Sequence, residues 1–104
     1  MSNKSYLHIS AAAGNTVVSA NSGVVLGGVY INIPAVAATS SVLTIFDAAT
    51  TAQCTAANTV AVINVQNTSI PGLEYLTPLS RGLAYSYVQT GAVTTVGDLT
   101  VTYQ

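Results

Sequence analysis

Two segments near the C-terminus decide the fold: RGLAYSYV, residues Arg81–Val88, and DLTVTY, residues Asp98–Tyr103. Both alternate large and small side chains with a period of two, which is typical of β-strands with one buried face. In the first segment, Leu83, Tyr85 and Tyr87 share a face. The loop between the segments contains two glycines, so we expect the two strands to return on each other as an antiparallel pair.

The rest of the chain reads as short strands separated by turn residues. Strand-like patterns cover residues 6–9, 16–19, 24–33, 41–47, 59–65 and 73–76. With the last two segments this makes about eight strands at a spacing of roughly 8–12 residues, which is the pattern of a sandwich or barrel. We therefore predict a single all-β domain over residues 1–104, an antiparallel β-sandwich of jelly-roll-like type, with an immunoglobulin-like sandwich as the alternative. Residues 1–5 are a candidate N-terminal arm.

Three local features refine this prediction. Gly27-Gly28, inside the longest apolar run, indicates a β-bulge or the close approach of another backbone. The segment Ala48–Asn58 is rich in Ala and Thr without a clear period, so we expect at most an isolated helical turn there. Ile70-Pro71-Gly72-Leu73 has the residues of a type II turn.

The chain carries very little charge. Only 5% of its residues are charged, against roughly 25% in an average soluble domain. The formal net charge is -1, which leaves little electrostatic repulsion between copies. Polarity comes instead from Ser, Thr, Asn and Gln. Such a surface suits a protein that is packed against other protein.

Composition argues against several classes of partner and location. The two basic residues, Lys4 and Arg81, cannot form a track for phosphates, so nucleic-acid binding is not expected. No run of about 20 apolar residues indicates a membrane helix, and the N-terminus lacks the continuous apolar region of a signal peptide. Cys54 is the only cysteine, which excludes an internal disulfide.

Groups capable of catalysis are few and scattered: Lys4, His8, Asp47, Cys54, Glu74, Arg81 and Asp98. They match no nucleophile elbow, phosphate-binding loop or zinc motif. Asp47 and Asp98 stand at strand ends, where aspartate commonly accepts hydrogen bonds from an adjacent turn. We predict no catalytic residue, no cofactor and no metal. A small hydrolase using His8 or Cys54 is kept as an alternative.

Candidate contact residues come from the aromatic, charged and loop positions. The chain has six tyrosines and no tryptophan, and tyrosine serves equally in a core or at an interface. Tyr85, Tyr87 and Tyr103 are expected to cover the core. Glu74 and Arg81 could pair with each other or with a neighbouring subunit, and two valines occupy the last loop, where a partner or a tucked loop would explain them. The predicted subunit or capsid interface is Lys4, Tyr6, Tyr30, Glu74, Tyr75, Arg81, Val93 and Val96.

The order of five segments resembles small structural proteins of tailed phages. They are LGGVYIN (Leu26–Asn32), SVLTIFD (Ser41–Asp47), VAVIN (Val60–Asn64), RGLAY (Arg81–Tyr85) and GDLTVTY (Gly97–Tyr103). The resemblance covers roughly residues 24–103 and rests on the order and spacing of the segments. It implies a β-sandwich, in some cases a jelly roll, that coats a capsid as a cement or decoration protein, often as a trimer.

We therefore expect a non-enzymatic virion structural protein, located at the capsid surface. Its expected partners are further copies of itself, with a homotrimer favoured, and the major capsid protein. Besides the small hydrolase, two other functions stay open at this point. One is a phage tail, baseplate or fibre component. The other is a carbohydrate-binding or adhesive module, which would need the tyrosines to form an exposed row.

Overall fold

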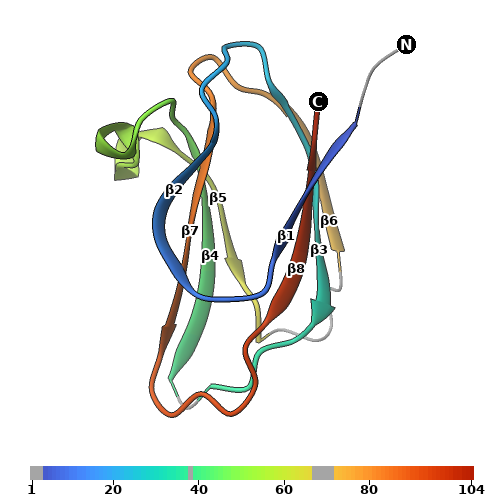
Figure 1. Cartoon of the computed structure of the whole chain (residues 1–104), viewed down its shortest axis with the longest axis vertical. Coiled ribbons are helices and arrows are strands. Elements are labelled where there is room, and N and C mark those ends of the chain that lie inside the picture. The colour runs from blue at the N-terminus through green and yellow to red at the C-terminus, as the bar shows by residue number, and fades with distance from the viewer. Residues whose placement is uncertain (1–3, 38, 67–71) are drawn as a thin grey trace.

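The computed structural model describes residues 4–37, 39–66 and 72–104, and these residues form eight β-strands and two short 3₁₀ turns (Figure 1). The strands are β1 (Ser5–Ile9), β2 (Ala13–Ser19), β3 (Val25–Ile33), β4 (Ser40–Asp47), β5 (Thr59–Asn64), β6 (Gly72–Pro78), β7 (Leu83–Thr90) and β8 (Asp98–Tyr103). The 3₁₀ turns are η1 (Thr51–Gln53) and η2 (Ala56–Asn58).

The strands form two four-stranded antiparallel sheets that face each other. The first sheet has the order β1-β8-β3-β6 and the second sheet the order β2-β7-β4-β5. The strands pair in a nested series, from the outermost pair in sequence to the innermost: β1 with β8, β2 with β7, β3 with β6 and β4 with β5. The predicted sandwich is confirmed, and this nesting is jelly-roll-like. It differs from the immunoglobulin arrangement, in which strands ABED and CFG share sheets.

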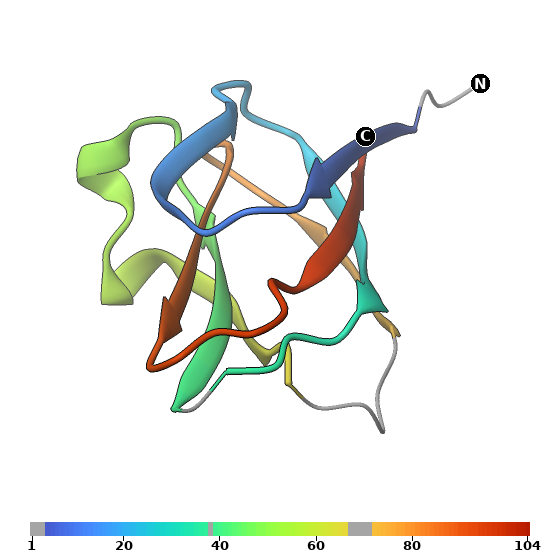
Figure 2. The same ribbon diagram turned by 60° about the horizontal axis from the view of Figure 1, so that its bottom comes forward.

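The predicted pairing of the last two strands is wrong. β7 lies between β2 and β4 in the second sheet, whereas β8 lies between β1 and β3 in the first sheet. Figure 2 shows the connection between β7 and β8 crossing from one sheet to the other. Both strands turn their large side chains toward the same core from opposite sides. A two-residue turn would have forced a hairpin, but the longer connection allows each strand to find two distant partners.

The core lies between the two sheets and is built from the alternating positions. The predicted inner face of β7 is confirmed, since Leu83, Tyr85 and Tyr87 are 1%, 9% and 0% exposed. Leu26 from β3 and Leu43 from β4 are fully buried against it. The inner positions therefore supply the apolar burial that holds the sandwich together.

A second, smaller apolar cluster lies outside this core. It consists of Phe46, Ala48 and Ala84, with Val17 and Cys54 packed against it. Phe46 and Ala84 are register partners on β4 and β7, and each follows or precedes a core residue, so both point to the outer face of the second sheet. The two 3₁₀ turns belong to the connection that leads from β4 to β5 beside this face.

The glycine pair in β3 marks a bulge, as predicted. The register of β3 shifts between Leu26 and Gly28 against both of its neighbours. A Cβ atom at Gly27 would lie 2.6 Å from the Oγ1 of Thr102 and 3.1 Å from its carbonyl oxygen. Gly28 N–H donates to the same Oγ1 at 2.9 Å. The close approach of β8 therefore requires glycine at position 27.

Other local predictions have mixed outcomes. Residues 48–58 hold only isolated 3₁₀ turns, so the absence of a long helix from that segment is confirmed. Ser5 pairs with Tyr103 inside β1, so the strand includes the last residue of the expected arm. The predicted turn at 70–73 begins outside the described residues, and its last two residues belong to β6.

Among the described residues no helix is long and apolar enough to span a bilayer.

Candidate functional site

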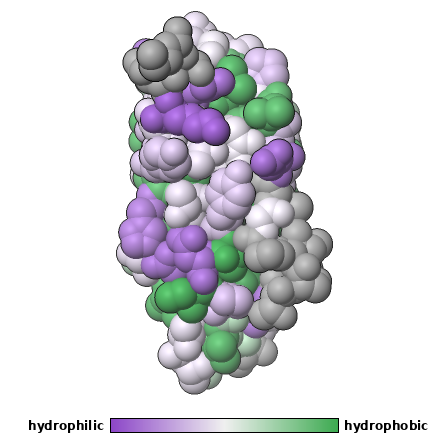
Figure 3. Space-filling model, turned by 90° about the vertical axis from the view of Figure 1, so that its right-hand side faces the viewer, coloured by the Kyte–Doolittle hydropathy of each residue, from purple (hydrophilic) through white to green (hydrophobic). Residues whose placement is uncertain are grey.

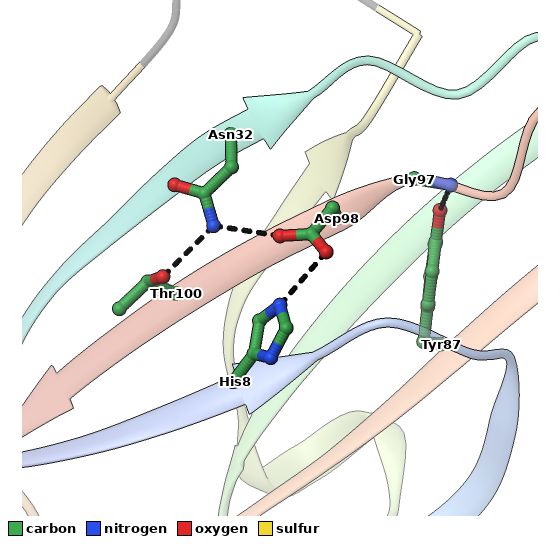
Figure 4. A network of polar contacts seen from close by, with 6 residues as sticks. All are labelled: His8, Asn32, Tyr87, Gly97, Asp98 and Thr100. Carbon is green, nitrogen blue, oxygen red and sulfur yellow. Dashed lines mark hydrogen bonds and ion pairs between the residues drawn. The ribbon is translucent and has the colours of Figure 1, made fainter.

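A polar network lies on the outer face of the first sheet and joins three of its strands (Figure 4). Asp98, the first residue of β8, accepts a hydrogen bond from Asn32 Nδ2 at 2.8 Å through Oδ1. Its Oδ2 lies 2.7 Å from His8 Nε2 on β1. Asn32 Nδ2 also donates to Thr100 Oγ1 at 2.9 Å. These bonds tie β1 and β3 to the central strand β8.

The electrostatics of this network favour an ionised carboxylate. The pKa of Asp98 is lowered, first by the hydrogen bond from Asn32 and then by the hydrogen bond from His8. The side chain of His8 is 61% exposed. Among the described residues, no hydroxyl or thiol hydrogen-bonds to His8, so the network holds strands and presents no activated nucleophile.

Cys54 is far from this network. It packs against the Phe46 cluster on the outer side of the second sheet, whereas His8 lies on the outer face of the first sheet. Desolvation raises the pKa of Cys54, which disfavours the reactive thiolate. The two residues kept as hydrolase candidates therefore do not form a nucleophile–base pair. Within residues 4–37, 39–66 and 72–104, no three His, Cys, Asp or Glu side chains gather as metal ligands.

A shallow hollow lies on the outer face of the first sheet, beside the bulge in β3. Its volume is about 80 Å³, and it is lined by Lys4, Val25, Gly27, Tyr30, Glu74, Leu76, Thr102, Tyr103 and Gln104. Gly27 leaves the hollow open because it has no side chain. Lys4 and Glu74 place opposite charges on its wall. Figure 3 views this side of the molecule, where hydrophobic residues are separated by polar ones.

The hollow brings together three of the eight predicted contact residues, Lys4, Tyr30 and Glu74. Tyr6, on the edge strand β1, is 68% exposed. Tyr75 instead packs against the core from β6, because it occupies an inward position between the outward residues Glu74 and Leu76.

The remaining three contact residues lie elsewhere. Arg81 is in the turn between β6 and β7, and Val93 and Val96 are in the connection between β7 and β8. Figure 1 places these two connections at opposite ends of the sandwich. The eight predicted residues therefore do not form one continuous surface.

Asp47 accepts hydrogen bonds from the turn between β6 and β7. Its position at the end of a strand predicts hydrogen bonds from the turn that is adjacent in sequence. Its carboxylate accepts hydrogen bonds from the backbone N–H groups of Arg81 at 2.7 Å, Ser80 at 3.2 Å and Gly82 at 3.3 Å. The Ser80 hydroxyl donates to it as well, at 3.0 Å. Desolvation raises the pKa of Asp47, but these hydrogen bonds outweigh it, so the pKa lies below its ordinary value. Arg81 and Glu74, both described, form no ion pair.

The loop with the two valines is partly tucked against the β3–β4 connection. The backbone N–H of Val36 donates to the carbonyl of Thr95 at 2.9 Å, and the N–H of Thr94 donates to the carbonyl of Val36 at 2.9 Å. Val93 is half-buried, and Val96 is 42% exposed. Of the two valines, Val96 is therefore the one that stays available for a contact.

Several exposed apolar side chains are absent from the contact residues that the sequence predicts. They are Ile33, Val36, Val62, Leu76 and Val88, each at least half exposed. For those that lie on strands, the alternation could have indicated them: Val62 alternates with the buried Ala61 and Ile63, which places it on the outer face. The polar network had no such signal, because the register that aligns His8, Asp98 and Asn32 joins residues distant in sequence.

No family model, curated protein or solved structure matches this chain. Its function is therefore inferred from the surface of the fold and from its composition.

Proposed function

We propose that this protein is a non-enzymatic virion structural protein, a capsid cement or decoration protein that binds the major capsid protein as a symmetric oligomer. The observation that carries the proposal is that the surface exposes large apolar side chains and has very little charge. Large apolar side chains are exposed on strands of both sheets, including Tyr6, Leu76 and Val62 at 68%, 70% and 64%, and in the β3–β4 and β7–β8 connections. Only 5% of the residues are charged.

This combination favours permanent contact with other protein. Exposed apolar residues are ordinary when scattered singly, but they normally accompany a charged surface that keeps a free protein soluble. Here the chain has one lysine, Lys4, and one arginine, Arg81. A cement protein works through buried area and shape complementarity, so it requires neither a metal nor an activated nucleophile.

The strand order adds to the resemblance described above. Jelly rolls occur in viral capsid and lectin domains, and the five segments that resemble phage structural proteins all contribute to strands β3, β4, β5, β7 and β8. Fold alone does not assign function, so the phage role rests on the resemblance and on the surface together.

The decisive experiment is rebinding to particles of the virus that encodes the chain. Purified particles would be stripped of this protein, mixed with the recombinant chain and separated by sedimentation. We expect the chain to return to the capsid at a fixed copy number and to raise the temperature at which the shell opens. Binding to isolated tails or baseplates with no binding to capsids would replace the capsid role by the tail, baseplate or fibre alternative.

A carbohydrate-binding role is a second candidate because of one observation. Tyr6 and Tyr30 are both exposed on the outer face of the first sheet, and Tyr30 lines the hollow with Glu74 and Gln104. An aromatic ring beside a carboxylate and an amide can stack on and hydrogen-bond to a sugar. Glycan binding that is lost in Tyr30→Ala and kept in Val88→Ala, on the opposite sheet, would favour this role.

A further inference from the structure

The sandwich has four outer strands, each with one edge that faces away from its sheet. They are β1 and β6 in the first sheet and β2 and β5 in the second sheet. An open edge exposes unpaired N–H and C=O groups and readily pairs with another chain. Natural proteins therefore protect their edges with short strands, charges, prolines or bulges.

Three of the four edges carry such protection. β6 contains Pro78 and a register shift, and Leu76 within it has a positive φ of 49°. β2 has two register shifts against its neighbour. β1 directly follows the charged residue Lys4 and carries the polar side chain of His8. Each of these features interrupts the ladder that a second chain could add or places a charged or polar side chain beside it.

β5 lacks this protection along most of its length. Its sequence, TVAVIN, has no charge, no proline and no glycine, and it is rich in residues that favour strands. Its one register shift lies near its start, and Ala61–Asn64 then pair with Val42–Ile45 without interruption. In the described part of the chain, no backbone group of β5 hydrogen-bonds to anything but β4. From Ala61 to Asn64 the segment is therefore an uncharged edge without register shifts, and no described residue outside β4 forms backbone hydrogen bonds to it.

We propose that two copies of this chain pair antiparallel through β5, so that their second sheets join into one continuous sheet of eight strands. The inference rests on the self-association included in the proposed function, and it names the surface. Val62 is 64% exposed at this edge and lies in the middle of the unbroken segment. Pairing buries it beside the same strand of the partner.

A second copy fits this edge better than a different partner. Antiparallel pairing of one edge with itself is a two-fold contact, in which each residue meets its counterpart under the same rotation. The two strands then match in length and polarity automatically. The edge carries no charge that would face its own copy, and the net charge of -1 opposes association only weakly.

The same geometry limits the assembly to two copies. Pairing β5 with β5 uses that edge on both chains, and the joined sheet then ends in β2 on each side. The register shifts of β2 prevent further strand addition. A closed dimer is therefore favoured over an open fibre, and also over a trimer, which would have to pair β5 with a different edge.

The test compares Val62→Lys with Val88→Lys. Both valines are half exposed or more on the outer face of the second sheet, but only Val62 lies on the edge strand. Sedimentation and light scattering of the full chain over a wide concentration range should show a dimer for the unchanged protein and for Val88→Lys. Val62→Lys places two like charges near the two-fold axis, so its dissociation constant should rise at least about tenfold.

Hydrogen exchange of the unchanged protein supplies a second measurement that needs no variant. The amides of Val60–Asn64 that point away from β4 should become protected as the concentration rises. A protein that stays monomeric throughout, a stable trimer, or equal weakening by both substitutions would overturn the proposal. Rebinding to particles distinguishes the β5 pairing from the proposed function. If the protein is a monomer and still rebinds capsids, only the pairing is overturned. If the protein is a dimer and does not bind particles, only the capsid role is overturned.

Discussion

The hydroxyl of Tyr87 in the second sheet accepts a hydrogen bond from the backbone N–H of Gly97, at 3.1 Å, just before β8 begins in the first sheet. The two strands that carry the strongest sequence pattern are thus linked across the core through a buried side chain. The same hydroxyl lies 2.7 Å from Ser41 Oγ and accepts from Gln89 Nε2 at 2.7 Å. We regard this hydroxyl as the polar centre that fixes where the chain crosses between the sheets.

Replacing Tyr87 by Phe should destabilise the fold without changing its shape. The substitution leaves the buried N–H of Gly97 without this partner, whereas Ser41 Oγ still accepts a hydrogen bond from Gln89 Nε2 at 3.2 Å. An unsatisfied buried group costs about 1–3 kcal/mol, so we expect the free energy of unfolding to fall by about 2 kcal/mol. Urea unfolding would measure it. Tyr6→Phe, at an exposed tyrosine, should change it by under about 0.5 kcal/mol, and equal effects of the two substitutions would contradict this account.

Gly97→Ala should be costly, whereas Gly14→Ala should not. A Cβ atom at position 97 would overlap the Tyr87 hydroxyl and lie 2.6 Å from Cγ1 of Val65. At position 14 nothing lies within 4 Å of the added atom. Overpacking of a core typically costs about 1–3 kcal/mol, and an unhindered site changes stability by under about 0.5 kcal/mol. Thermal unfolding of the two variants should show a clear drop for position 97 alone.

Asp47 should make stability depend on pH in the acid range. Its pKa in the folded protein lies below the ordinary value of 3.8, so its contribution is fully present above that pH. The contribution is lost as the pH falls through the folded pKa, because protonation weakens the hydrogen bonds from residues 80–82. Asp47→Asn should lower the free energy of unfolding at neutral pH by about 1–3 kcal/mol. On acidification, the free energy of unfolding of this variant should then fall by less than that of the unchanged protein.

The matched control for this prediction is Glu74→Gln. It removes one exposed carboxylate that accepts no hydrogen bond from the described residues. Unfolding free energies would be measured from neutral pH down through the acid range for all three proteins. If Asp47→Asn and the unchanged protein lose stability in parallel, the turn does not depend on the charge of Asp47.

The carboxylate of Asp98 should respond to removal of Asn32. The hydrogen bond from Asn32 is the largest cause of the lowered pKa of Asp98, so Asn32→Ala should move that pKa upward, toward its ordinary value. Carbon NMR of the carboxyl group during a pH titration would follow it. Thr100→Val removes the second partner of Asn32 and leaves Asp98 untouched, so its effect should be smaller. No shift in Asn32→Ala would mean that the network does not set the ionisation of Asp98.

Strand positions could be read from the sequence because they depend on local alternation. The pattern of Leu83, Tyr85 and Tyr87 identified the buried face of β7, and the glycines at 27 and 28 identified the bulge in β3. The hollow could be anticipated only in part. Lys4, Tyr30 and Glu74 were selected singly, for charge or aromatic character, and no local pattern showed that they would meet.

By itself the sequence determined the class of the fold, the approximate bounds of eight strands and the inward faces, because a period of two is a property of each strand alone. Only the tertiary structure decided which strands are neighbours. β7 and β8 are adjacent in sequence and lie in opposite sheets, because each gains two long-range partners there and covers the shared core from its own side. β5 pairs only with β4, because the other side of β4 is taken by β7, and it therefore lies at an edge of the second sheet, which its uncharged sequence alone could not show.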